Sequence, residues 1–114
     1  MLTVYGLKNC ETCRKATKWL TAENIPYTFH DVRKDGIDRA KIAGWLNDVG
    51  WEVLLNRRGS TWRNLTNIDK DGIDEIKVTD LMILNPTLIK RPVCDLNGKI
   101  LVGFKESDKA LLIS

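Results

Sequence analysis

The first 30 residues change their hydrophobic period twice, and this change restricts the fold more than any other feature of the chain. Residues 2–6 favour a β-strand that stops at a glycine, and residues 26–30 alternate apolar and polar side chains as a second strand does. Between them, from about residue 11 to 23, apolar side chains recur at helical spacing, and Asn24 and Pro26 end that helix. A strand, a helix and a strand over so short a length predict a βαβ unit with two parallel strands and a right-handed crossover.

A helical insert is predicted after this unit, from about residue 36 to 88. An apolar face indicates a helix over about residues 38–49, and residues 51–56 can add one or two turns. Residues 57–72 are mixed in composition and are expected to be irregular or briefly helical. Thr79 is expected to cap a helix that runs to Leu84 and ends before Asn85-Pro86.

The last part of the chain predicts a β-hairpin followed by a helix. Asn97-Gly98 lies between two strand-like runs, and this dipeptide favours a type I′ turn, which needs a positive φ at two successive residues. A helix over about residues 105–112 follows. The order βαβ, helical insert and ββα predicts an α/β, thioredoxin-like fold, in which helices flank both faces of a mixed four-stranded sheet. At 114 residues, we expect a single domain over residues 1–114.

Composition excludes several classes of protein. With 43% hydrophobic and 29% charged residues, the chain is neither disordered nor a membrane protein. The net charge of +3 is spread along the chain, so we expect no direct binding to nucleic acid. The first residues form a strand-like run without a basic leader or a cleavage site, which predicts a cytoplasmic protein without a membrane partner. We expect it to be a monomer.

The chemistry is expected at Cys10 and Cys13, which are three positions apart where the first loop meets the first helix. Free N–H groups and the helix dipole at this point stabilise an anion. An ordinary thiol with a pKa near 8.5 is only about 3% thiolate at pH 7, and a pKa lower by about two units makes the thiolate the main species. Cys10 is then the nucleophile, and Cys13 can attack a mixed disulfide formed on Cys10.

Other interpretations of the cysteines stay open at this stage. The pair could be half of a zinc site, but a second pair is missing, and Cys94 and His30 would assist only if the fold brought them close. The pair could also be two inert helix cysteines. We predict no metal site. Cys94 is expected to be a buried thiol in a central strand, and His30 a half-exposed residue at a strand end.

Arg91-Pro92 is the second informative feature. In the thioredoxin-like plan, the proline that opens the third strand has a cis peptide bond beside the reactive sulfur. This position would bring Lys90 and Arg91 near Cys10, where they could hold an anionic substrate or a carboxylate of glutathione. On its own, an Arg-Pro dipeptide is equally consistent with a solvated turn.

Several motifs, in their order and spacing, resemble the arsenate reductase (ArsC) family over essentially the whole chain. They are Asn9-Cys10 with Cys13-Arg14-Lys15-Ala16, Leu54-Leu55-Asn56 with Gly59-Ser60-Thr61-Trp62-Arg63, Asn85-Pro86-Thr87-Leu88-Ile89-Lys90-Arg91-Pro92, and Val102-Gly103-Phe104.

The resemblance implies that Cys10 is the nucleophile, that Arg91 is one of three arginines that hold an oxyanion, and that Pro92 is the cis-proline. It also suggests that Asn9, Arg58 and Lys90 bind substrate. Two of the three arginines are missing, because Asn56 replaces one and residues 102–104 lack the other. The absence of one such charged group from a buried oxyanion site weakens binding by on the order of 1.5–3 kcal/mol.

The function implied is that of a glutathione-dependent thiol–disulfide oxidoreductase, as proposed for an arsenate-reductase-related subgroup. Glutathione would be a co-substrate, no cofactor would be bound, and a glutaredoxin could be a further partner. The alternative is a redox-switched transcription regulator like Spx, which binds the RNA polymerase α subunit and has a glycine near position 50. The third option is a true arsenate reductase.

Overall fold

The structure, a computed structural model that describes residues 2–113, divides the chain into two compact units. The sheet unit contains the residues up to 35 and from 91 onward, and the helical unit contains residues 36–90. The prediction that the whole chain is one domain stays a prediction. In the described part, no helix has the length and apolar character needed to cross a membrane.

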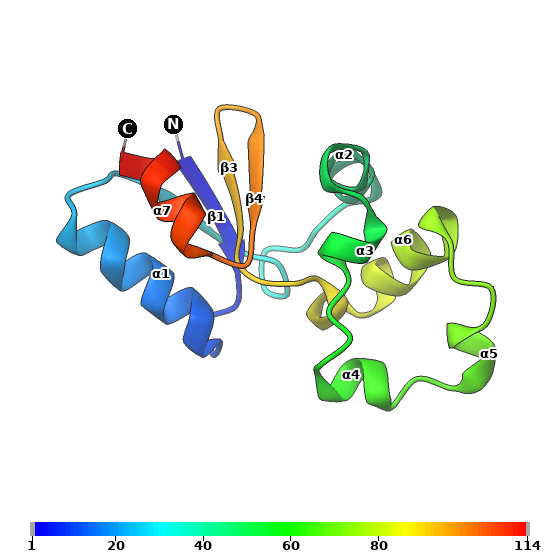
Figure 1. Cartoon of the computed structure of the whole chain (residues 1–114). Coiled ribbons are helices and arrows are strands. Elements are labelled where there is room, and N and C mark those ends of the chain that lie inside the picture. The colour runs from blue at the N-terminus through cyan, green and yellow to red at the C-terminus, as the bar shows by residue number, and fades with distance from the viewer. Residues whose placement is uncertain (1, 114) are drawn as a thin grey trace. The chain divides into compact units, whose positions relative to one another are not determined.

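The sheet unit contains four strands and two long helices (Figure 1). The elements are β1 (Leu2–Gly6), α1 (Glu11–Ala22), β2 (Thr28–Asp31), β3 (Val93–Leu96), β4 (Lys99–Val102) and α7 (Glu106–Ile113). The strand order is β2-β1-β3-β4, with β1 and β2 parallel and the other neighbours antiparallel. The predicted α/β fold with a mixed four-stranded sheet flanked by helices is confirmed.

The β3–β4 hairpin forms as predicted. Asn97 and Gly98 have φ angles of 50° and 95°, which are the two successive positive values that a type I′ turn requires. The carboxylate of Asp95, on β3, accepts a hydrogen bond from the Gly98 N–H (2.8 Å), and this bond links the turn to the strand before it.

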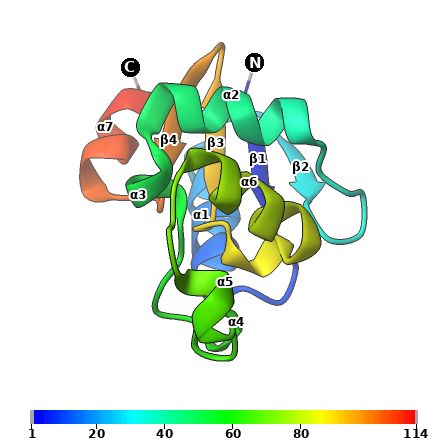
Figure 2. The same cartoon turned by 90° about the vertical axis from the view of Figure 1, so that its right-hand side faces the viewer.

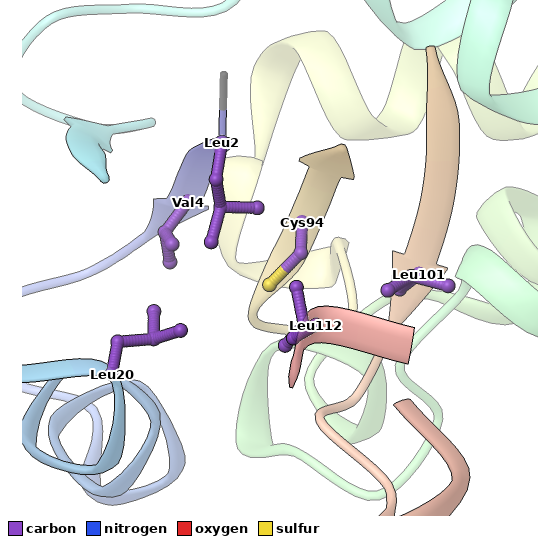
Figure 3. Close-up of a cluster of buried hydrophobic side chains, with 6 residues drawn as sticks. All are labelled: Leu2, Val4, Leu20, Cys94, Leu101 and Leu112. Carbon is purple, nitrogen blue, oxygen red and sulfur yellow. The ribbon is translucent and has the colours of Figure 1, made fainter. Parts of the chain in front are cut away.

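One core of the sheet unit lies between the strands and the helices α1 and α7 (Figure 3). The cluster contains Leu2, Val4, Leu20, Cys94, Leu101 and Leu112. Since Leu20 belongs to α1 and Leu112 to α7, both helices pack on the same face of the sheet, as Figure 1 shows. Cys94 is 1% exposed in the central strand β3, so its predicted burial is confirmed.

The helical unit consists of short helices, with α6 packed against α2 (Figure 2). Its elements are α2 (Arg39–Val49), α3 (Trp51–Leu54), α4 (Ser60–Arg63), α5 (Asn67–Lys70), α6 (Glu75–Leu84) and a 3₁₀ turn, η1 (Pro86–Leu88). Trp45 and Met82 are among its fully buried side chains. A backbone bridge between Leu55 and Ile89 joins the segment after α3 to the segment after η1.

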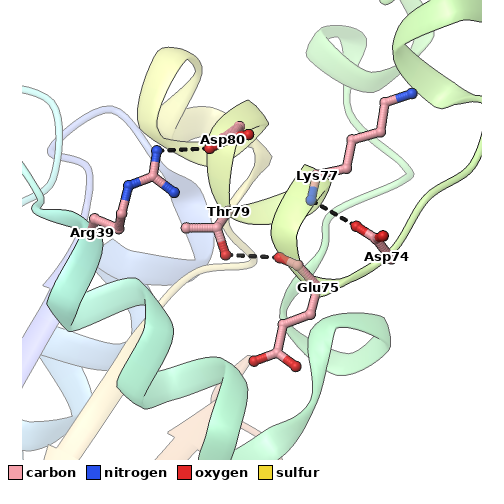
Figure 4. A network of polar contacts seen from close by, with 6 residues as sticks. All are labelled: Arg39, Asp74, Glu75, Lys77, Thr79 and Asp80. Carbon is pink, nitrogen blue, oxygen red and sulfur yellow. Dashed lines mark hydrogen bonds and ion pairs between the residues drawn. The ribbon is translucent and has the colours of Figure 1, made fainter.

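The predicted start of α6 is wrong. The helix begins at Glu75, and Asp74 is its N-cap, whose carboxylate accepts a hydrogen bond from the Lys77 N–H (2.8 Å; Figure 4). Thr79 lies inside the helix, and its hydroxyl donates to the Glu75 carbonyl four residues earlier (2.8 Å). Aspartate is at least as good an N-cap as threonine, and a threonine inside a helix can satisfy its hydroxyl on the preceding turn.

Candidate active site

Cys10 is the N-cap residue of α1. Its backbone is extended (φ −117°, ψ 121°), and its carbonyl accepts the Arg14 N–H (2.9 Å), the first bond of the helix. The thiol makes no capping hydrogen bond of ordinary geometry and is half-buried. The sulfur is therefore held at the N-terminal end of a twelve-residue helix, where the dipole favours a negative charge.

The surroundings of Cys10 lower its pKa. Partial burial raises the pKa, but the backbone N–H and the thiol of Cys13, together with the guanidinium of Arg91, lower it by more. These groups stabilise the thiolate directly, since each presents a hydrogen or a positive charge to the sulfur. Cys10 therefore ionises below the pH at which an ordinary thiol does.

Cys13 has the opposite character. It is 1% exposed, and this burial, together with the neighbouring Cys10 thiolate, raises the pKa of Cys13 to about 12. At neutral pH Cys13 therefore keeps its proton. The pair therefore consists of one reactive thiol and one protonated, buried thiol.

Gly6, at the end of β1, makes the position of Cys13 possible. A Cβ atom built on Gly6 would lie 2.5 Å from the Cys13 sulfur, which is closer than real atoms approach. The sulfur packs directly on the strand backbone, so this position requires a residue without a side chain. From the sequence, Gly6 was expected only to end a strand, and the only available signal was a glycine just before a cysteine-containing loop.

Arg91 and Pro92 belong to the sheet unit and lie where β3 begins. The Arg91–Pro92 peptide bond is cis, as predicted, and Pro92 is fully buried. The Pro92 carbonyl accepts the Gly103 N–H (2.9 Å), which ties this segment to the end of β4. The guanidinium of Arg91 acts electrostatically on both Cys10 and Cys13, so the structure brings these three predicted residues together.

Asn9 lies in the loop before Cys10 and lines a pocket of about 420 Å³. The side chains of Lys8, Arg33 and Lys34 line the same pocket, together with one carboxylate, Asp31. The N–H of Lys34 donates to this carboxylate (2.9 Å) and is the main cause that lowers the pKa of Asp31. Three cations and one carboxylate give the pocket a net positive charge.

The other predicted substrate-binding residues, Arg58 and Lys90, belong to the helical unit, and both are exposed. Their role at Cys10 stays a prediction. Asn56, which stands where the family resemblance expects an arginine, accepts the Arg58 N–H (3.1 Å) and so shapes its own loop. Arg57 lies over the ring of Trp51, 5.2 Å from its centroid.

Neither the third cysteine nor the histidine adds to a metal site in this structure. Cys94 points into the apolar core described above, and the half-exposed His30 packs its ring against Tyr5 at 5.0 Å. Among residues 2–113, no three histidine, cysteine or acidic side chains gather closely enough to hold a metal ion.

The two buried thiols predict a loss of stability at alkaline pH. Above pH about 9, the thiols of the unfolded chain ionise, whereas Cys13 and Cys94 keep their protons up to a pKa of about 12. The folded state then binds more protons, so raising the pH favours unfolding by up to about 1.4 kcal/mol per pH unit for each thiol. The free energy of unfolding is measured in urea, under reducing conditions, at several pH values from 9 to 10.5. It should fall less steeply with pH for Cys94→Ala than for the wild type. An equal dependence of the unfolding free energy on pH in the two chains would contradict the prediction.

The fold and the position of Cys10 define a thioredoxin-like protein with a thiol pair at the start of α1. The ArsC family model matches residues 5–110, and the chain belongs to the ArsC family. This finding confirms the resemblance seen in the motifs.

Similar proteins agree with this assignment. The chain is 45% identical to an uncharacterized protein of Haemophilus influenzae, over 95% of both chains. A solved structure named YffB protein superposes with a TM-score of 0.95, at 41% identity over the full length of both chains. An arsenate reductase (ArsC) related protein from Brucella melitensis is 42% identical, with a TM-score of 0.79 over 96% of this chain and 92% of that one.

A regulator is also among the relatives. The global transcriptional regulator Spx of Staphylococcus aureus is 31% identical over 95% of this chain and 83% of its own length.

Proposed function

We propose that the protein is a glutathione-dependent thiol–disulfide oxidoreductase in which Cys10 is the nucleophile. The observation that carries the proposal is the contrast within the pair, because the pKa of Cys10 is lowered while that of Cys13 is raised to about 12. A thiolate is the reactive form in disulfide exchange, so only Cys10 is prepared to attack.

The reaction begins when the Cys10 thiolate attacks one sulfur of a substrate disulfide. The substrate S–S bond breaks, a Cys10 mixed disulfide forms, and the leaving thiolate takes a proton from water. Cys10 then carries no charge, so the part of the Cys13 pKa increase that comes from this charge disappears. Cys13 next loses its proton and attacks Cys10, which releases the second substrate thiol. Two glutathione thiols reduce the Cys10–Cys13 disulfide and leave as glutathione disulfide.

Glutathione is an anionic tripeptide, and the sheet unit contains two positive features, one at Cys10 and one in the pocket lined by its sequence neighbour Asn9. Arg91 lies close enough to the sulfur to lower its pKa, and the pocket beside Asn9 presents Lys8, Arg33 and Lys34. We expect these groups to hold the carboxylates of glutathione. Such a reductant belongs to the cytoplasm, where we place the protein, and a glutaredoxin would be a further source of electrons.

A glutathione titration followed by residue-resolved NMR tests this function. Perturbations are expected at Asn9, Cys10, Arg91 and Lys34, and Lys99, an exposed residue on β4, serves as the internal control. A titration that leaves the residues around Cys10 unmoved, or moves Lys99 equally, would reject the proposed co-substrate.

A second candidate is a redox-switched regulator, favoured by the identity with Spx and by Gly50. This glycine ends α2, is exposed and has a φ angle of 85°. A purified C-terminal domain of the RNA polymerase α subunit should then bind near Gly50 with an affinity that depends on the oxidation of Cys10 and Cys13. The absence of binding in both redox states would dismiss this candidate. Arsenate reduction is the third candidate, and an assay with Cys10→Ser as control tests it.

A further inference from the structure

A groove on the sheet unit lies between α1 and the start of α7, apart from the pocket beside Asn9. Its volume is about 540 Å³, within the range of ligand pockets, and we call it the α1–α7 groove. The groove is lined by two aromatic residues, three lysines and one carboxylate, with Thr12 and Ala22 beside them: Trp19, Phe104, Lys15, Lys18, Lys109 and Glu106. Thr12, which lines the groove, stands between the two cysteines in the sequence.

The apolar part of the groove is held by a strained backbone. Trp19 and Phe104 meet edge to face, with their ring centroids 5.6 Å apart. Phe104 has a φ angle of 53°, in the left-handed region that a bulky side chain rarely adopts. Such outliers cluster at functional sites, where the surrounding structure enforces them. Here the strained conformation places an aromatic ring beside Trp19.

The polar part of the groove carries a net positive charge, from three lysines against the single carboxylate of Glu106. The Lys109 ammonium lies over the rings of both Trp19 and Phe104, at 5.6 and 5.3 Å, and also 3.1 Å from the Glu106 carboxylate. Lys15 forms only an exposed ion pair with Glu11 (3.6 Å), and such pairs are weak. Lys18 makes no ion pair within residues 2–113, so its charge is available to a ligand.

This combination favours an acidic group attached to an apolar side chain. The ammonium groups attract a carboxylate, and the ring edges offer apolar contact beside it. A nucleobase would need an open ring face on which to stack, but Lys109 already lies over the faces of both rings. A polypeptide segment with acidic and apolar residues, which needs only edge contact with the rings, fits the groove better than a nucleic acid does.

We propose that the α1–α7 groove binds a segment with acidic and apolar residues in a protein whose disulfide is reduced at Cys10. The proposal rests on the proposed function and narrows its substrate from any disulfide to a protein disulfide. The chemistry is the exchange already described, in which the partner's S–S bond breaks on Cys10 and two glutathione thiols supply the electrons. The groove adds only the docking of the partner next to the sulfur.

Binding is tested with the Cys10→Ser variant, which keeps the groove and removes the chemistry. The probes are three synthetic peptides of equal length that contain one phenylalanine flanked by glutamate, by glutamine or by lysine. In NMR titrations, the glutamate peptide should shift the Trp19 indole and the amides of Phe104 and Lys109. The glutamine peptide should bind about tenfold more weakly, and so should the glutamate peptide to a Cys10→Ser/Lys18→Glu chain.

Lys99→Glu in the same Cys10→Ser background is the matched control, because Lys99 is an exposed lysine outside the groove. The proposal is overturned if the groove residues do not shift, if the glutamate and glutamine peptides bind equally, or if Lys99→Glu weakens binding as much as Lys18→Glu. The wild-type protein is assayed separately with glutathione and a small organic disulfide. An inactive wild type would reject the proposed function and with it the reduction of a protein partner, while an active enzyme without groove binding would reject only the docking site.

Discussion

Replacing Cys10 by serine is expected to reduce glutathione-dependent disulfide reduction to the uncatalysed background. A serine hydroxyl is not ionised at neutral pH and cannot form a disulfide, so neither the attack nor the covalent intermediate remains. The assay is the turnover of a small disulfide with glutathione, and intact-protein mass spectrometry follows the mixed disulfide. The Cys10→Ser chain should form none.

Cys13→Ser is the matched control for this prediction. In that variant the Cys10 thiolate still attacks, because the helix position and Arg91 remain, but no second thiol resolves the product inside the chain. A mixed disulfide on Cys10 should therefore accumulate, and turnover should depend on glutathione for the resolving step. Retention of full activity by Cys10→Ser, with loss of activity in Cys13→Ser, would mean that the two roles are reversed.

Gly6→Ala is expected to destabilise the protein by about 1–3 kcal/mol, which is the usual cost of inserting a methyl group into a packed site. The new Cβ would lie 2.5 Å from the Cys13 sulfur, so either the strand or the thiol must move. Gly6 has no positive φ, so the backbone conformation itself suits alanine. The measurement is the free energy of unfolding in urea, under reducing conditions.

A double-mutant cycle separates this contact from a general effect of the substitution. Cys13→Ala removes the sulfur, so Gly6→Ala should cost little in that background, and the new methyl group would fill part of the space left behind. Cys13→Ser keeps an oxygen close to the same place and should not rescue the substitution. If the changes in unfolding free energy caused by Gly6→Ala and Cys13→Ala simply add, the cost of Gly6→Ala does not come from contact with the Cys13 sulfur.

Local signals were sufficient to predict most of the sheet unit. The asparagine–glycine pair at 97–98 predicted the hairpin, because few other residues accept two positive φ angles. The change from alternating to helical period predicted β1, α1 and a parallel β2, although β2 begins at Thr28 rather than at Pro26. The start of α6 was misplaced because Asp74 and Thr79 are both good caps, and only the packing of the helix decides between them.

The candidate site also contains some features that local sequence patterns predict and others that depend on contacts between distant residues. The position of Cys10 at the start of a helix could be predicted from the local pattern, and such a position stabilises an anion whatever the rest of the fold is. The contact of Gly6 with Cys13 and the assembly of Trp19, Phe104 and Lys109 join residues that are distant in the sequence, so no local pattern contains them. Gly103 and Phe104 were noticed as part of a motif, but the left-handed conformation of Phe104 depends on the packed structure.

The large difference in acidity between the three thiols makes this chain convenient for chemical labelling without engineering. Cys13 and Cys94 are both buried and protonated, so a mild electrophile at slightly acidic pH should modify Cys10 alone. A fluorophore or an affinity handle could thus be attached to one defined sulfur of the native sequence. The same selectivity would allow the protein to be retrieved, with whatever is disulfide-linked to it, from cells that have been treated with a thiol-trapping reagent.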